Sequence, residues 1–121
     1  MISLEPDVEA DAIGYLDPLL TARVSTKVPN PRVADMVQLS VVGGSGVTDK
    51  ALANALVSVQ CWAATTVAAS LLARQVAAHL RAWGDYEVRT GTPQSFPDSA
   101  TSPPLPRYVF TAELWGLASP A

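Results

Sequence analysis

The stretch that decides the fold reads VSTKVPNPR from Val24 to Arg32, and the run MVQLSVVGG from Met36 to Gly44 follows it closely. Each proline of the first run fixes its own φ at about −65° and pushes the residue before it out of the helical region. That segment is therefore a stiff, extended corner. The second run alternates apolar and polar side chains, which is typical of a strand with one buried face. We predict a strand over residues 23–28, a proline corner that presents Arg32, and a strand over residues 36–42.

Two segments predict helices, because apolar side chains recur in them at helical spacing. The first spans residues 6–20, with a kink or an end expected at Pro18. The second follows a threonine cap and spans residues 65–83, and we expect Gly84 to end it in a left-handed conformation. The expected core stripe of the second helix consists of Val67, Leu71, Leu72, Val76 and Leu80.

Three more segments predict strands and complete the fold class. Residues 56–62 and 107–115 alternate cleanly between an apolar and a polar face, and residues 86–92 form a shorter strand. Residues 47–54 are expected to continue a glycine loop or to form a helical turn, and residues 93–106 to form a long proline-rich loop. We predict a single α+β domain over residues 1–121, with a small mixed, mainly antiparallel sheet of four to five strands and two helices packed on one face.

Composition narrows the class of protein. A chain of 121 residues suits one domain with one core. An apolar fraction of 49% beside 16% charged residues is high for a lone soluble domain, so we expect neighbouring subunits to cover part of its surface. The net charge of −3 argues against a surface built for nucleic-acid phosphates or anionic lipid.

The sequence shows neither a targeting signal nor a pair of cysteines that would indicate a particular cellular compartment. The first residues lack the basic and apolar regions of a signal peptide, and no apolar run approaches the ~20 residues of a membrane span. We therefore expect synthesis in the cytoplasm and no membrane insertion. The single cysteine excludes an internal disulfide.

The sequence does not combine its candidate catalytic residues with the second functional group that each type of site requires. His79 is the only histidine, so no site with two imidazoles can form. Cys61 lies on the apolar face of its strand, which predicts a buried thiol of high pKa. The glycines of residues 43–46 are not followed by the lysine and hydroxyl of a phosphate loop. We expect no enzyme activity, no cofactor and no metal site.

Two tryptophans and two arginines each leave two interpretations open. Trp62 and Trp115 share strand faces with polar residues, so each either packs under a loop or against the first helix, or contacts another subunit. Arg32 and Arg107 each stand beside a proline and have the same two interpretations.

The ordered set of segments resembles the tail terminator proteins of long-tailed, siphovirus-like bacteriophages, particularly those encoded by phages of actinobacteria. The similarity runs from about Asp7 to Leu117. Its carriers are the acidic first helix ending in Tyr15-Leu16, the run Val24–Arg32, the strand ending in Val42-Gly43-Gly44, the triplet Thr48-Asp49-Lys50, and the strands Val57–Ala63 and Arg107–Ala112.

The resemblance implies an α/β subunit that assembles as a hexameric ring, ends polymerisation of the tail tube and forms the surface onto which the head connector or stopper protein docks. It implies no catalysis, and it implies that DNA passes through the lumen without specific binding. Such a protein is assembled in the host cytoplasm and resides in the virion at the head–tail junction. The candidate assembly interface consists of Pro29, Asn30, Pro31, Arg32, Asp49, Lys50, Trp62, Arg107 and Trp115.

Other classes of protein stay open at this point. The nearest is another head–tail connector or tail-completion protein of the same phage. A small ligand-binding α+β domain, or an enzyme, would need a concave site with convergent polar groups. A DNA-binding regulator would need a basic face.

Overall fold

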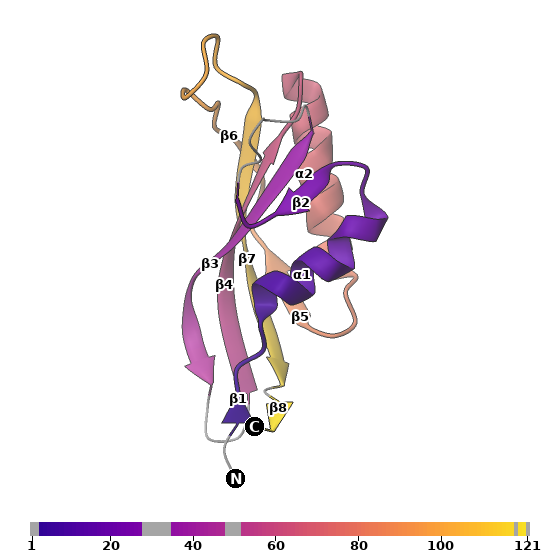
Figure 1. Ribbon diagram of the computed structural model, residues 1–121, viewed down its shortest axis with the longest axis vertical. Coiled ribbons are helices and arrows are strands. Elements are labelled where there is room, and N and C mark those ends of the chain that lie inside the picture. The colour runs from indigo at the N-terminus through magenta and orange to yellow at the C-terminus, as the bar shows by residue number, and fades with distance from the viewer. Residues whose placement is uncertain (1–2, 28–34, 48–51, 118, 121) are drawn as a thin grey trace.

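Figure 1 shows the computed structural model of the chain, which describes residues 3–27, 35–47, 52–117 and 119–120. The elements are β1 (Ser3–Leu4), α1 (Val8–Leu16), the 3-10 turn η1 (Asp17–Leu19), β2 (Arg23–Ser25), β3 (Met36–Val47), β4 (Leu52–Trp62), α2 (Thr66–Arg81), β5 (Glu87–Thr90), β6 (Gln94–Ser95), β7 (Arg107–Leu117) and β8 (Ser119–Pro120). The fold is α+β, as the sequence predicts.

The main sheet has six strands, in the order β2-β3-β4-β7-β5, with β6 also paired to β7. Strand β2 runs parallel to β3, and every other pair in this sheet is antiparallel. The sheet is therefore mixed and mainly antiparallel, with one strand more than the four to five expected, because β6 forms inside the proline-rich loop. A separate two-stranded sheet of β1 and β8 lies at the end of the molecule away from β6 (Figure 1).

Both helices pack on one face of the main sheet, which we call the covered face (Figure 1). The strand side chains on this face alternate with those on the opposite face, as the sequence predicts for β4 and β7. Together with helix residues they form one apolar cluster, to which the strands contribute Val24, Val37, Leu39, Ala55, Val57, Val59, Cys61, Phe110, Ala112 and Leu114.

The two ends of helix α1 are set by Asp7 and by Pro18. The Asp7 carboxylate accepts a hydrogen bond from the Ala10 backbone N–H at 3.1 Å and so caps the first turn. Val8, Ala12 and Leu16, four residues apart, are buried against the sheet. The expected change at Pro18 is confirmed, because the α-helix gives way there to η1.

Helix α2 is capped by Thr65, whose hydroxyl accepts from the Ala68 N–H at 3.1 Å. The predicted core stripe is wrong at two positions, because Val67 is 78% exposed and Leu71 47% exposed. The helix is rotated so that small side chains face the sheet, and this allows the helix axis to approach the strands closely. The buried residues of α2 are Ala69, Leu72, Ala73, Val76, Ala77 and Leu80.

The predicted left-handed end at Gly84 is also wrong. Helix α2 ends at Arg81, and its C-cap Ala82 keeps right-handed φ and ψ angles while its N–H bonds to the last turn. Among the glycines of the described segments, positive φ occurs at Gly44 and Gly46. Both residues lie in strand β3 and not at the end of a helix.

Strands β3 and β4 extend well beyond their predicted limits. Instead of the loop or helical turn expected over residues 47–54, β3 runs on to Val47 and β4 begins at Leu52. The glycines are accommodated by shifts in register between Val41 and Gly43 and between Gly43 and Gly46. A Cβ atom at Gly44 would lie 2.5 Å from the Asn54 carbonyl oxygen, so the bulged strand requires glycine there.

Candidate functional site

The face of the main sheet opposite the helices, which we call the open face, is the first candidate site. Its side chains are mostly polar and remain at least partly accessible to solvent. The described members along the centre of this face are Gln38, Ser40, Leu56, Ser58, Gln60, Val109, Thr111 and Glu113. A sheet face of this composition is suited to water or to contact with another protein.

At one end of the open face, Trp62 anchors the loop of residues 96–106, which we call the anchored loop. The Trp62 side chain is 1% exposed, and its indole N–H donates to the Asp98 carboxylate at 2.9 Å. The other Asp98 carboxylate oxygen accepts from the Ala100 N–H at 3.0 Å. One buried carboxylate therefore orders the loop and satisfies the buried indole. The loop also forms a β-bridge between Asp98 and Leu105.

Arg107 holds the same loop from its other side. Its Nε–H donates to the Phe96 carbonyl at 2.8 Å, and an Nη–H donates to the Gln60 side-chain oxygen at 3.1 Å. The guanidinium carbon lies 5.6 Å from the centroid of the Trp62 ring and 5.0 Å from that of the Phe96 ring. Both distances are within the range of a cation–π contact. The Phe96 ring is nevertheless 60% exposed, so a fixed loop presents an apolar side chain to solvent.

The residues proposed from the sequence as an assembly interface therefore differ in their burial and in their contacts. Trp62 packs under a loop, which was one of its two interpretations, and is too deeply buried to contact a partner directly. Arg107 is half-buried and bonded to the anchored loop. Trp115 is 37% exposed and lies eight residues along β7, which places it about 27 Å from Arg107. The candidates Pro29, Asn30, Pro31, Arg32, Asp49 and Lys50 lie outside the described residues.

The sequence analysis missed Phe96 and Asp98. Both stand in a proline-rich stretch that carries the signals of a turn, and Asp98 resembles an ordinary turn residue. The nearest available signal was Trp62 itself, because a buried indole N–H requires an acceptor that its own strand does not supply.

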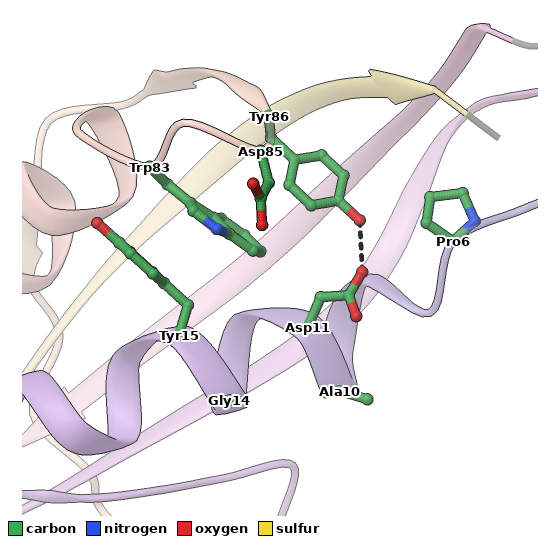
Figure 2. A pocket seen from close by; sticks show the side chains of 8 residues that line it. All are labelled: Pro6, Ala10, Asp11, Gly14, Tyr15, Trp83, Asp85 and Tyr86. Carbon is green, nitrogen blue, oxygen red and sulfur yellow. Dashed lines mark hydrogen bonds between the residues drawn. The ribbon is translucent and has the colours of Figure 1, made fainter. Parts of the chain in front are cut away.

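A second candidate site is a groove of about 580 Å³ on the helical side, lined by Pro6, Ala10, Asp11, Gly14, Tyr15, Trp83, Asp85 and Tyr86. Figure 2 shows the parallel rings of Tyr15 and Trp83 on one side of it and Tyr86 on the other. The Tyr15 and Trp83 centroids are 4.8 Å apart with an interplanar angle of 8°, and Tyr86 meets Trp83 at 4.5 Å and 49°. We call this site the acidic groove.

Hydrogen bonds fix the rings of the acidic groove. The Tyr15 hydroxyl donates to the His79 carbonyl at 2.7 Å, and the Tyr86 hydroxyl donates to the Asp11 carboxylate at 2.7 Å (Figure 2). Burial, the hydrogen bond to Asp11 and the nearby charges of Asp11, Asp85 and Asp7 all raise the pKa of Tyr86 above its usual range. Several carboxylates therefore act on one position in the groove.

The predicted character of Cys61 is confirmed. Its side chain is fully buried in the covered face, and burial raises the pKa of its thiol to about 12. A thiol in that environment is a poor nucleophile at neutral pH. Among the described residues, no group of three or more histidine, cysteine, aspartate or glutamate side chains is placed to hold a metal ion.

Comparison with protein families, with curated proteins and with solved structures finds no match to this chain. Within the described segments, no helix is long and apolar enough to cross a membrane.

Proposed function

We propose that this protein is a structural component of a long-tailed bacteriophage that caps the tail tube, ends its polymerisation and forms the docking surface for the head connector. In this proposal it acts as a ring, most simply a hexamer, at the head–tail junction of the virion, and is assembled in the host cytoplasm. It performs no catalysis and needs no cofactor. The proposal starts from the resemblance of the sequence segments to tail terminator proteins.

The observation that carries the proposal is the construction of the open face. The helices stabilise one face of the sheet and leave the other accessible, and an ordered loop at its end presents Phe96. The indole of Trp62 and the guanidinium of Arg107 fix that loop before any partner arrives. A preordered apolar contact loses little conformational entropy on binding, so it favours docking to another protein.

The charges of the open face suit a channel through which DNA slides. Most of the polar side chains along its centre carry uncharged hydroxyl or amide groups, and Arg107 is already bonded to Gln60 and to the loop. Arg89 of β5 stands directly opposite Glu113 of β7 in the register of the sheet, so these charges offset each other locally. Tight phosphate binding depends on clusters of free lysine or arginine, which release counterions.

A connector or tail-completion protein of the same phage would use the same features, and the assembly phenotype separates the two roles. A terminator without its docking contact yields tails of abnormal length or tails that do not join heads. A connector on the head side yields tails of normal length together with heads that stay empty or unjoined.

The experiment compares two exposed apolar residues, Phe96 on the anchored loop and Val67 on helix α2. A phage whose own copy of the gene is disabled is complemented with Phe96→Ser or with Val67→Ser. We expect both proteins to fold, because each side chain is largely exposed. Val67→Ser should change stability by less than about 0.5 kcal/mol, and Phe96→Ser, which also removes the cation–π contact with Arg107, by about 0.5–1 kcal/mol. We expect Phe96→Ser to give overlong or headless tails at least about tenfold more often than Val67→Ser.

Electron microscopy of the particles measures tail length and head joining, and circular dichroism verifies the fold. Normal, joined tails in the Phe96→Ser phage would remove the anchored loop from the docking surface. Normal tails in a phage that lacks the protein altogether would contradict the proposed function itself.

A further inference from the structure

The acidic groove combines aromatic rings with carboxylates, which is the chemistry of a binding site for an organic cation. We propose that it binds a guanidinium group, carried by a small ligand or by an arginine residue. This inference goes beyond the proposed function and does not depend on it, because the groove lies on the helical side of the main sheet and not on the open face.

Three aromatic side chains form one wall of the groove. Trp83 is buried and contacts both tyrosines, with the Tyr15 ring parallel to it at 4.8 Å and the Tyr86 ring tilted against it at 4.5 Å. Tyr15 and Tyr86 are only half-buried, so part of each ring stays accessible in the groove. Their hydroxyl groups are hydrogen-bonded, which fixes both rings before a ligand arrives. Guanidinium groups pack well on such rings, because they are planar and weakly hydrated.

Two carboxylates of the groove have oxygens that a cation can reach. Figure 2 shows the Asp85 carboxylate extending toward the groove between Trp83 and Tyr86. Within the described residues no hydrogen bond or ion pair engages that carboxylate. Asp11 accepts from the Tyr86 hydroxyl through one oxygen and keeps its other oxygen for a ligand. Both charges act on the Tyr86 hydroxyl, whose pKa they raise, so they also attract a cation beside that ring.

The chain does not fill the groove with a cation of its own. None of the lining residues is basic. Arg81, the arginine nearest to the groove residues in sequence, donates from its guanidinium to the Thr90 hydroxyl at 2.7 Å. The floor of the groove is also open, because a Cβ atom built at Gly14 would have no atom within 4 Å. The volume of about 580 Å³ lies within the ~300–1,000 Å³ of small-ligand sites.

A metal ion is the other cation that carboxylates bind. Calcium and magnesium ions need several oxygen ligands that converge on one point. Among the described residues, no group of three or more histidine, cysteine, aspartate or glutamate side chains is placed to hold a metal ion. An aromatic wall adds no strong ligand for such an ion, whereas it does stabilise a delocalised planar cation. The groove therefore favours a guanidinium group over a metal ion.

The test titrates the isotope-labelled protein with two ligands of the same shape. The amide of N-acetylarginine carries a guanidinium group, and the amide of N-acetylcitrulline carries an uncharged urea group in its place. NMR follows the backbone amide of Gly14 and the indole N–H of Trp83, which both lie at the groove. We expect saturable shifts with the arginine ligand and binding at least about tenfold weaker with the citrulline ligand.

Four variants locate the site. Asp85→Asn removes a lining carboxylate, whereas Glu87→Gln removes the same charge from an exposed side chain that does not line the groove. We expect Asp85→Asn to weaken binding of the arginine ligand at least about threefold and Glu87→Gln to weaken it less than about 1.5-fold. Gly14→Gln fills the groove and should weaken binding, whereas Gly14→Ala leaves the groove open and should not. Circular dichroism verifies that each variant is folded.

Three results would overturn the inference. The first is equal binding of the arginine and citrulline ligands, and the second is equal weakening by Asp85→Asn and Glu87→Gln. The third is the absence of saturable shifts at both Gly14 and Trp83 up to about 20 mM ligand, because the dissociation constant would then lie beyond the millimolar range. None of these results bears on the proposed function, which is tested by assembly.

Two further ligands identify the source of the guanidinium group. Methylguanidinium that binds as tightly as the amide of N-acetylarginine would support a small ligand. A blocked tripeptide with a central arginine that binds at least about tenfold more tightly than methylguanidinium would support an arginine residue of a protein. Both outcomes support the guanidinium site.

Discussion

The two faces of the main sheet are built by different means. On the covered face, strand and helix side chains exclude water and form one apolar cluster. On the open face, order comes from a few directed contacts at one end, where Trp62, Asp98 and Arg107 hold the anchored loop. The difference indicates that the covered face supplies the stability of the subunit, whereas the open face is available for assembly.

Leucines on the two faces give the largest expected difference. Leu39 of β3 points into the covered face and is 0% exposed, whereas Leu56 of β4 is half-buried on the open face. We expect Leu39→Ala to lower the free energy of unfolding by about 2–5 kcal/mol, because a cavity remains in the cluster. We expect Leu56→Ala to lower it by less than about 1.5 kcal/mol and to impair assembly more than its stability loss explains.

Urea denaturation of the two variants measures the first effect, and particle assembly in a complemented phage measures the second. Equal stability losses at Leu39 and Leu56 would contradict the assignment of the core to one face. A Leu56→Ala protein that assembles normally would show that this part of the open face contacts no partner.

The next largest expected effect is the loss of folding stability when Asp98 of the anchored loop is substituted. Asp98→Ala removes the acceptor of the Trp62 indole N–H and leaves a buried donor unsatisfied. We expect a loss of about 1–3 kcal/mol in the free energy of unfolding. Asp98→Asn is the control, because its amide oxygen still accepts one hydrogen bond, and it should lose less than Asp98→Ala. If the two substitutions cost the same, the bond between Trp62 and Asp98 does not fix the loop.

The covered face also predicts a pH dependence through Cys61. Burial raises the pKa of its thiol from 9.0 to about 12, so the native state retains a proton that the unfolded chain releases as the pH rises above 9. This contribution to stability is present below pH 9 and is lost between pH 9 and 12. The expected slope is about 1.4 kcal/mol per pH unit above 9.

Thermal or urea unfolding from pH 8 to pH 10.5 (about 0.5-unit steps) compares the wild type with Cys61→Ala, which lacks this group. The raised pKa of Tyr86 acts in the same direction in both proteins and cancels in the comparison. Parallel stability curves for the two proteins would show that the thiol is not buried in the native state in solution.

Most of the fold was predictable from the sequence, because alternation and capping are local signals. The alternating runs that became β4 and β7 placed their faces correctly, and Thr65 and Pro18 marked helix boundaries. The rotation of α2 was not predictable in this way, since close approach to the sheet favours alanine over the larger Val67. The glycine run of β3 was interpreted as a loop, because glycines are typical of loops, whereas in the structure these glycines lie at bulges inside the strand.

The candidate sites were less predictable than the fold, because they combine residues that are distant in the sequence. Trp62, Arg107 and Trp115 were identified, but the Asp98 acceptor that decides the position of Trp62 lies 36 residues away from it. The acidic groove joins residues of α1 to the segment after α2, as in the hydrogen bond between Tyr86 and Asp11. No local pattern reports such a contact. It follows from how the helices pack.

The central claim, that this subunit leaves one sheet face open in order to assemble, is tested most directly by its assembly state. The measurement is the mass of the particle in solution, by light scattering, joined to negative-stain images of the protein alone and with tail tube protein. We predict a closed ring with a central opening in at least one of the two samples. A monomer in both samples would contradict the account.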